Sequence, residues 1–208
     1  MGRLLVLAGA NGSGKSSIAG ALLRQHGGDY FNPDEVARAL TDIDPSLETR
    51  EANSLAWHEG VRRLEAAIAD DHDFNVETTL GGQTIPRILR DAIARGMDVV
   101  VWYVALATPE LHIARVAARV AGGGHDIPEA EIRRRFDSSR LNLIELMPGL
   151  AALKVFDNSA HADLARGEAP QPELVLHVQG GKIVEVCDLA TAAEWAKPIL
   201  AAALAIDV

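Results

Sequence analysis

Short unbroken runs of apolar residues recur along the chain and are separated by longer stretches with helical spacing. The run at residues 4–8 ends at a glycine, and the run at 99–106 is among the longest. An apolar run without alternation is typical of a strand buried on both faces of a parallel sheet. Weaker signals of the same kind predict strands at 29–31, 74–77 and 153–156.

The stretches between these runs carry apolar residues at the spacing of amphipathic helices. In the longest of them, at 47–70, the apolar positions are Leu55, Val61, Leu64 and Ile68. Further helices are expected at 15–25, 35–40, 86–96, 109–121 and 128–146. Because strands alternate with helices, the pattern predicts an α/β fold with a parallel sheet and right-handed crossovers.

The last part of the chain departs from this alternation. Residues 174–178 and 183–186, joined through two glycines, predict a β-hairpin, and a closing helix is expected from Thr191. We therefore expect a five-stranded, mainly parallel sheet followed by a C-terminal hairpin and helix at about 173–206. All of these elements belong to one expected domain, 1–208.

The composition agrees with a globular domain. The chain has 208 residues, of which 48% are hydrophobic and 24% charged, and this balance excludes an intrinsically disordered protein. The apolar runs are too short to span a bilayer, and the amino terminus lacks a signal-peptide pattern. The single cysteine, Cys187, excludes an internal disulfide and suits a reducing compartment. We expect a cytoplasmic protein without a membrane partner.

The charge balance is acidic, with 20 Lys and Arg against 29 Asp and Glu and a net charge of −9. Such a surface is a poor partner for nucleic acid, and we expect no nucleic acid to bind. Six of the sixteen arginines nevertheless fall between residues 115 and 140. Arginines clustered in an acidic protein indicate a local anion site.

A phosphate-binding loop lies between the first strand and the helix that follows it. Residues 9–16 match the Walker A pattern G-x-x-x-x-G-K-[ST] at every fixed position. In such loops backbone N–H groups surround phosphate oxygens at a helix amino terminus. We expect Lys15 to reach the β- and γ-phosphates of ATP, and Ser16 to bind Mg²⁺. The predicted nucleotide-binding residues are Gly9, Ala10, Asn11, Gly12, Ser13, Gly14, Lys15, Ser16 and Ser17.

The motif by itself leaves several classes of phosphate-loop protein open. Residues 80–83 match part of a transporter-ATPase motif, but the strand at 99–106 is not followed by the paired acidic residues of that class. The guanine-reading motif Asn-Lys-x-Asp is also absent from the sequence. We therefore interpret residues 80–83 as a loop. We expect a small-molecule kinase with the three-layer α/β/α fold of P-loop NTPases, of the nucleoside- and shikimate-kinase type.

A kinase of this kind needs a carboxylate that orients or deprotonates the acceptor hydroxyl. Asp34 follows the second expected strand, on the sheet edge where the phosphate loop also lies. Position alone leaves two interpretations of Asp34 open, a catalytic carboxylate or an N-cap of the helix at 35–40. Glu77 lies at another strand end beside Thr78 and Thr79. It could contact a substrate hydroxyl or a magnesium-bound water, or be an ordinary loop charge.

The arginine cluster meets the second requirement, cations for the migrating phosphoryl group. Arg115 and Arg119 share a helix face, three glycines follow, and residues 133–135 are all arginine. Helix, glycine hinge and arginine-rich helix together indicate a lid over the nucleotide at about 115–140. The alternative is two solvated helix faces, in which residues 133–135 pair with Glu129 and Glu131.

Six short motifs occur in order along nearly the whole chain. They are residues 9–16, Asn32-Pro33-Asp34, 76–80, Arg119-Val120 with Gly123-Gly124-His125, 132–136 and Asp157-Asn158-Ser159. This ordered set resembles the zeta-toxin family of phosphate-loop kinases. The resemblance implies an ATP- and Mg²⁺-dependent enzyme that phosphorylates the 3′ hydroxyl of the sugar in UDP-N-acetylglucosamine. It also implies a separate antitoxin protein as a partner.

The same resemblance implies roles for individual residues. Asp34 would be the general base, and Glu77, with Thr78 and Thr79, would contact the substrate. Lys15 would act on the transferring group from the phosphate loop.

Residues of the expected lid also receive roles from this resemblance. Arg119 and one of Arg134 or Arg135 would bind the transferring phosphate, whereas His125 receives no role. Residues 157–159 would border the nucleotide base, or form a turn with Asx-type hydrogen bonds.

Two further hypotheses remain open. The first is a kinase for another hydroxyl compound, such as a nucleoside, a sugar or an antibiotic. The second is a slow ATPase or nucleotide-dependent switch that acts through a partner protein. Asp34 separates them, because a kinase needs a carboxylate that faces the acceptor and a switch does not.

Overall fold

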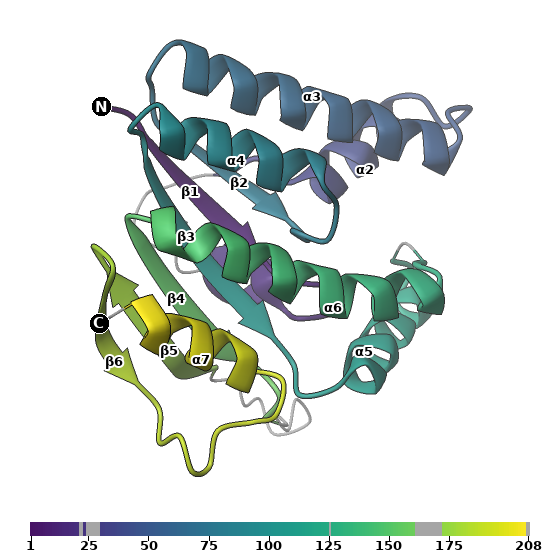
Figure 1. Ribbon diagram of the computed structural model, residues 1–208. Helices are drawn as coiled ribbons and strands as arrows, with labels where there is room; N and C mark the ends of the chain where they lie inside the picture. Colours follow the sequence, from purple (N-terminus) through teal and green to yellow (C-terminus); the bar gives the residue numbers. More distant parts are fainter. Residues whose placement is uncertain (21–22, 24–29, 125, 161–171, 207–208) are drawn as a thin grey trace.

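The sheet is the centre of the fold in the computed structural model, which describes residues 1–20, 23, 30–124, 126–160 and 172–206. Among these residues six strands pair in the order β2-β1-β3-β4-β5-β6 (Figure 1). They are β1 (Arg3–Ala8), β2 (Phe74–Thr78), β3 (Asp98–Ala105), β4 (Ala152–Asp157), β5 (Glu173–Gln179) and β6 (Lys182–Val186). The first four are parallel, and β5 and β6 extend the sheet in antiparallel pairing. The expected hairpin is therefore part of the central sheet.

The strand expected at 29–31 is reduced, in its described residues, to a single bridge at the edge of that sheet. Phe31 makes an isolated parallel bridge to Val76, and residue 29 lies outside the described residues. The pairing ends after Phe31 because Asn32 caps the next helix and Pro33 has no N–H to donate.

Helices alternate with the first four strands, as the sequence predicts. They are α2 (Pro33–Ile43), α3 (Thr49–Ala69), α4 (Thr84–Ala94), α5 (Pro109–Ala121), α6 (Glu129–Leu146) and, after the hairpin, α7 (Lys197–Ile206), with short turns η1 (Ser16–Gly20) and η2 (Met147–Gly149). The turn η1 is π-helical and lies at the start of the helix expected at 15–25, most of whose remaining residues are not described. In the described part, no helix is both long and apolar enough to cross a membrane.

The closing helix begins at Lys197 and not at Thr191. A turn precedes it, in which the Asp188 side chain accepts from Ala190 N at 2.9 Å and the Asp188 backbone carbonyl accepts from Thr191 N at 3.1 Å. Short polar side chains that bond neighbouring backbone groups in this way compete with helix formation.

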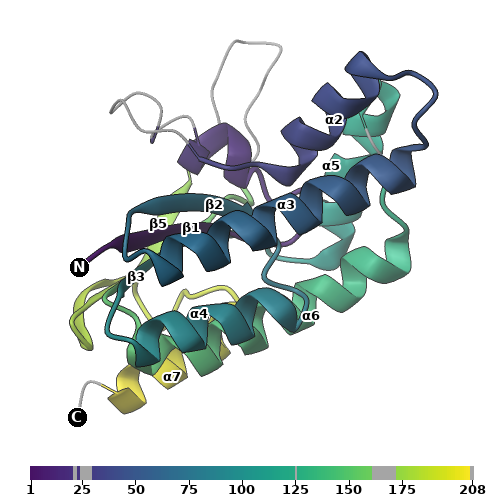
Figure 2. The ribbon, with the colours of Figure 1, turned by 90° about the horizontal axis from the view of Figure 1, so that it is seen from above.

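The main hydrophobic core lies between the sheet and helices α3, α4, α6 and α7 (Figure 2). Leu4 and Val6 of β1 belong to this core, whereas Leu5 and Leu7 belong to a second cluster that includes Tyr30. All four β1 side chains are buried. Burial on both faces explains why the sequence of β1 is apolar without alternation.

The buried face of α3 differs from the expected one. Its buried residues are Ala52, Ala56, Gly60, Leu64, Ala67 and Ile68. Leu55, which the spacing placed on the apolar face, is 48% exposed. Ala52 and Ala56 form a small cluster with Ala37 of α2, and such small residues contribute little to a hydrophobic periodicity.

We predict that Leu64→Ala and Leu55→Ala differ sharply in their effect on stability, although both make the same change in one helix. Leu64 is fully buried, so its truncation should lower the free energy of unfolding by about 2–5 kcal/mol. Leu55→Ala should change it by less than about 0.5 kcal/mol. Urea denaturation of the two variants measures the difference, and equal losses would contradict the assigned face of α3.

Candidate active site

The loop between β1 and η1 depends on glycine. Gly9 has a φ of +143° and Gly14 a φ of +87°, which other residues rarely adopt. A Cβ on Gly9 would lie 2.1 Å from the Val104 carbonyl oxygen, and one on Gly14 would lie 2.5 Å from the Asn158 amide nitrogen. The backbone is therefore bare at both positions, as a loop that binds phosphate through its N–H groups requires.

Side chains from α5 and from the end of β4 hold this loop in place. His112 Nδ1 lies 2.7 Å from the Asn11 carbonyl oxygen, and Nδ1 must carry the proton because a carbonyl oxygen only accepts. Asn158 donates its amide to Ser13 O at 2.8 Å, and Arg115 donates to Asn158 O at 2.7 Å. Arg115, expected to belong to a lid, thus supports the floor of the site.

The residues at 157–159 form the turn that was one of their two interpretations. Asp157 accepts a hydrogen bond from Ser159 N at 2.7 Å, the Asx-type contact. Its other oxygen accepts from Trp195 Nε1 at 2.9 Å, and Trp195 is buried in the core. A border on the nucleotide base stays a prediction.

Sequence reasoning missed His112. Its side chain is fully buried and contacts the ring of Phe136 edge-on at 5.6 Å between centroids. Burial lowers the pKa of its imidazole to about 4, so the ring is neutral at pH 7. The available signal was its spacing of four residues from Val116, which marks the buried face of α5.

Lys15 and Glu77 form a buried ion pair at the ends of two neighbouring strands. Lys15 Nζ lies 3.4 Å from Glu77 Oε1, and both side chains are at most 9% exposed. The other Glu77 oxygen accepts a long hydrogen bond of 3.4 Å from Asn32 Nδ2. Glu77 is therefore not an ordinary loop charge, because it compensates the charge of the phosphate-loop lysine.

Asp34 lies at the start of α2 but does not cap it, so the N-cap interpretation is wrong. The helix begins at Pro33, and its N-cap is Asn32, whose Oδ1 accepts from Asp34 N at 3.0 Å. The carboxylate of Asp34 is half-exposed, and its Oδ2 lies 4.0 Å from Arg119 Nη1. The structure thus brings Asp34 together with one of the predicted arginines.

The three consecutive arginines of α6 have different surroundings. Arg135 donates to Asn11 Oδ1 at 2.8 Å, and burial lowers its pKa. Arg134 donates to the Gly81 carbonyl at 3.1 Å, and both Arg134 and Arg135 also pair with Glu131.

Arg133 points away from the site and pairs with Glu110 of α5 at 2.7 Å. The proposed pairing of residues 133–135 with Glu129 and Glu131 is therefore right for Glu131 in two of three cases. Even so, Arg134 and Arg135 line the main cavity, so their faces are not simply solvated.

The lid expected at 115–140 shares its second helix with the core. Gly122 ends α5 and Gly123 has a φ of +86°, as expected for the hinge, while His125 lies outside the described residues. In the second half of α6, however, Leu143 is fully buried, and Ser139 Oγ lies 2.8 Å from Tyr103 OH of β3. Closure of this region stays a prediction.

Residues 80–83 form a loop after β2, in agreement with their interpretation. Leu80 has a φ of +56°, and its carbonyl accepts from Asn142 Nδ2 at 2.7 Å. The Gly81 carbonyl accepts from Ser138 Oγ at 2.9 Å as well as from Arg134. Helix α6 therefore fixes the loop that follows Thr78 and Thr79.

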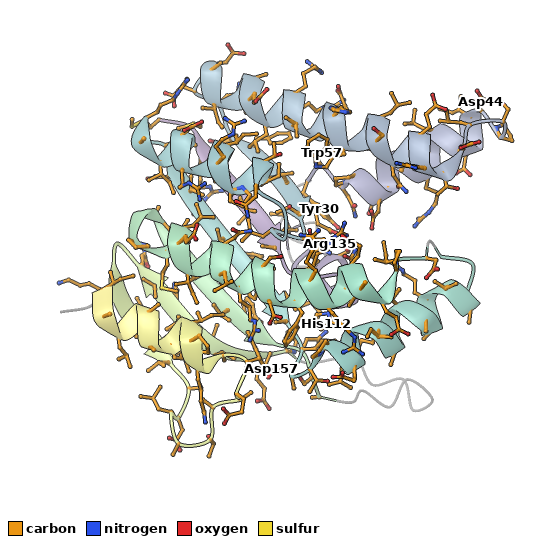
Figure 3. The ribbon with its side chains drawn as sticks, turned by 45° about the vertical axis from the view of Figure 1, so that its right-hand side comes forward. Tyr30, Asp44, Trp57, His112, Arg135 and Asp157 are labelled. Atoms are coloured by element: carbon orange, nitrogen blue, oxygen red, sulfur yellow. The ribbon has the colours of Figure 1, made fainter. Side chains whose placement is uncertain are left out.

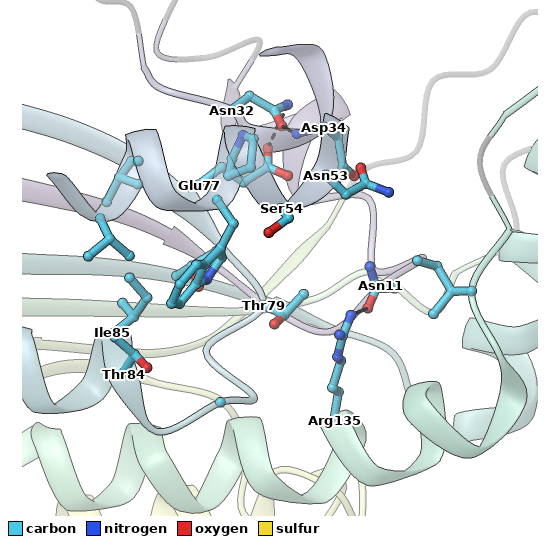
Figure 4. A pocket seen from close by; sticks show the side chains of 18 of the residues that line it. Asn11, Asn32, Asp34, Asn53, Ser54, Glu77, Thr79, Thr84, Ile85 and Arg135 are labelled. Carbon is cyan, nitrogen blue, oxygen red and sulfur yellow. Dashed lines mark hydrogen bonds between the residues drawn. The ribbon is translucent and has the colours of Figure 1, made fainter. Parts of the chain in front are cut away.

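These elements surround one cavity of about 450 Å³ (Figure 4). Of the predicted site residues, it is lined by Asn11, Lys15, Asp34, Glu77, Thr78, Thr79, Arg134 and Arg135. The remaining wall comes from α3 and the start of α4, with Arg50, Asn53, Ser54, Trp57, Thr84 and Ile85. Sequence reasoning missed this wall, because its residues form neither a motif nor a strand end.

In the cavity beside the phosphate loop, the glycine-dependent loop, the Asp34 carboxylate and several cationic side chains surround open space. Fold and site together define an α/β protein of the P-loop kinase-like class. The chain belongs to the family described as AAA domain (AAA_33), whose model matches residues 4–139.

Comparisons with known proteins agree with this fold. An uncharacterized protein of Haemophilus influenzae is 30% identical over 132 residues, which make up 62% of this chain and 88% of that protein. A chain of the AvrRxo1-ORF1:-ORF2 complex, solved with ATP, aligns with a TM-score of 0.65 and 17% identity, covering 98% of this chain and 64% of its own length. A structure of the PezAT toxin-antitoxin system of Streptococcus pneumoniae aligns with a TM-score of 0.50 and 15% identity, covering 76% of this chain and 67% of its own.

We predict that His112 makes stability depend on pH between about 4 and 6.5. In this range the imidazole binds a proton in the unfolded chain but not in the folded protein. The free energy of unfolding therefore decreases as the pH falls. The loss should approach about 3 kcal/mol at pH 4. His112→Gln should remove this part of the pH dependence, and the exposed His72→Gln should keep it. Urea denaturation at pH 7 and pH 4.5 measures both, and identical pH profiles for all three proteins would contradict the prediction.

Proposed function

We propose that the protein is an ATP- and Mg²⁺-dependent kinase that transfers the γ-phosphoryl group to a hydroxyl of a small molecule. The supporting observation is the juxtaposition of Asp34 with Lys15, Arg134 and Arg135 around one cavity at the mouth of the phosphate loop. Phosphoryl transfer needs little more than positioning and charge neutralisation, and these groups supply both. By its resemblance to the zeta-toxin family, UDP-N-acetylglucosamine is the leading acceptor.

The donor side is assigned to the phosphate loop. Its glycine-dependent backbone suits the binding of ATP phosphates, and Lys15 would exchange Glu77 for phosphate oxygens. The described residues contain no cluster of three or more His, Cys, Asp or Glu that could hold a metal. Mg²⁺ takes few protein ligands beside phosphate oxygens and water, and Ser16 would be one of them. Bound Mg²⁺ neutralises phosphate charge.

The acceptor side is assigned to Asp34, Glu77, Thr78 and Thr79. Asp34 would accept the proton of the acceptor hydroxyl. The hydroxyl oxygen would then bond to the γ-phosphorus while the bond from that phosphorus to the β,γ-bridging oxygen breaks. ADP leaves, and the acceptor becomes a phosphate monoester. Arg119, Arg134 and Arg135 would neutralise charge on the migrating group.

A second candidate is a slow ATPase or switch that acts through a partner protein. Likeness to chains from the AvrRxo1-ORF1:-ORF2 complex and the PezAT toxin-antitoxin system favours a separate partner such as an antitoxin chain.

We also assign the protein to the cytoplasm, a reducing compartment that suits its lone cysteine. The alternative within the same chemistry is a kinase for another hydroxyl compound, such as a nucleoside, a sugar or an antibiotic.

We predict that Asp34→Asn abolishes acceptor-dependent ADP formation and leaves ATP affinity nearly unchanged. Removal of a general base costs about 10²–10⁴ in rate, whereas Asp34 does not belong to the phosphate loop. Asp42→Asn makes the same change at the exposed far end of α2 and should be as active as the wild type. Calorimetry gives the ATP affinity and a coupled assay the rate; full activity of Asp34→Asn would remove the general base from the mechanism.

We predict that Arg135→Ala lowers kcat much more than Arg133→Ala, although both change the same arginine triplet. Arg135 lines the cavity and contacts Asn11, so its loss should lower kcat by about 10²–10³. Arg133 pairs with Glu110 outside the cavity, and its variant should keep nearly the full kcat. Steady-state kinetics with ATP and acceptor decide, and an equal loss in the two variants would contradict the assignment.

A further inference from the structure

One face of α3 forms a wall of the cavity that the phosphate chemistry leaves unused. Arg50, Asn53, Ser54 and Trp57 lie at positions i, i+3, i+4 and i+7, so they share a face, and all four line the cavity. Figure 4 shows Asn53 and Ser54 above Thr79 on the side opposite Arg135. The wall is fixed, because α3 is anchored through its buried residues, including Ala56 and Leu64.

Trp57 offers an apolar ring to the cavity. Its side chain is 41% exposed, although it is among the largest apolar groups of the protein, and it lies on the side of α3 that faces Arg135 (Figure 3). Its ring meets His58 edge-on, at 4.9 Å between centroids and an angle of 75°. Val61 and Ile85 line the cavity as well. An exposed indole in a concave site suits a planar ring or the apolar face of a sugar.

Arg50 offers a cation at the other end of the same wall. Within the described ranges, 1–20, 23, 30–124, 126–160 and 172–206, its side chain makes no ion pair or hydrogen bond. By contrast, Arg134 and Arg135 in the same cavity both pair with Glu131. Arg50 and Trp57 are seven positions apart in the helix, which is about 10 Å along its axis. An unpaired guanidinium in a cavity matches a phosphate or carboxylate of the ligand.

We propose that this face of α3 is the acceptor-recognition subsite, and that it selects acceptors that carry both a ring and an anionic group. Trp57 contacts the ring, Arg50 pairs with the anionic group, and Asn53 and Ser54 supply polar contacts between them. The proposal rests on the kinase function proposed above. It favours nucleotide-like and sugar-phosphate acceptors over uncharged sugars and nucleosides, and it makes Trp57 and Arg50 specificity-determining residues.

Binding without turnover tests the proposal first. The phosphate loop is filled with ADP and Mg²⁺, and UMP, UDP-N-acetylglucosamine and glucose 6-phosphate are titrated beside uridine, N-acetylglucosamine and glucose. Quenching of tryptophan fluorescence reports binding at Trp57, and Trp57→Phe identifies its share. We expect at least one charged compound to bind tenfold tighter than its uncharged counterpart. Arg50→Ala should weaken that compound by about 10- to 100-fold and abolish the preference.

Matched controls exclude a general effect of substitution in α3. Arg62→Ala removes an exposed arginine that pairs with Glu59 outside the cavity, and Leu55→Ala truncates an exposed apolar residue of the same helix. Both should bind like the wild type, and all variants should share its unfolding midpoint. No preference for charged compounds, or a preference that survives Arg50→Ala, would overturn the proposal.

Kinetics separate this proposal from the function on which it rests. In the transfer assay, Arg50→Ala and Trp57→Ala should raise the KM for the acceptor with little change in kcat or in the KM for ATP. Trp57→Phe should restore part of the loss. Active variants with an unchanged acceptor KM would overturn the subsite and leave the kinase intact, whereas absence of transfer by the wild type would count against the kinase itself.

Discussion

The phosphate loop after β1 brings Lys15 against Glu77 near the end of β2, and the burial of these two charges constrains the rest of the site. A buried ammonium group needs a compensating anion, and Glu77 supplies it at 3.4 Å. The parallel register of β1 and β2 places Leu7 opposite Glu77 and so sets where Glu77 lies relative to the end of β1. Phosphate oxygens of a nucleotide would offer the same lysine a second anion. The ion pair thus joins the phosphate loop to the strand end that carries Thr78, with Thr79 next to it.

Other cationic side chains also link the elements of the site. Arg135 contacts Asn11 of the phosphate loop, Arg119 lies near Asp34, and Arg134 bonds the loop after β2. Each contact joins α5 or α6 to another element of the site: the phosphate loop, the start of α2 or the loop after β2. A ligand with negative charge would enter where these side chains already converge. Because the second half of α6 is part of the core, their positions are set by the packing of the whole domain.

Much of the fold was predictable from the sequence, because periodicity reports burial directly. Strands such as β1 and β3 are unbroken apolar runs, and the Walker A motif located the phosphate loop. The prediction of a full strand at 29–31 went too far, because its pattern extends over too few residues to reveal that Pro33 would end the pairing. The prediction that Leu55 lies on the buried face of α3 was wrong, because Ala52 and Ala56 form that face and such small residues contribute little to a hydrophobic pattern.

The shared position of Lys15, Asp34 and Glu77 at one cavity was predictable, because the phosphate-loop motif and the strand ends meet at one edge of the sheet. Contacts between distant segments were not. His112 supports Asn11 from 101 residues away in the chain, and no local pattern announces such a bond. The cavity wall formed by α3 could be identified only once the helix was placed over the cavity.

Phosphorus NMR of the purified protein with ATP, Mg²⁺ and UDP-N-acetylglucosamine tests the central claim, transfer of a phosphoryl group to a hydroxyl, most directly. The account predicts that a new phosphate monoester signal grows in step with ADP, and that an acceptor panel of anionic ring compounds gives the same result if this sugar nucleotide is not the substrate. ADP and inorganic phosphate formed at one slow rate, whatever acceptor is present, would contradict it and favour the nucleotide-dependent switch.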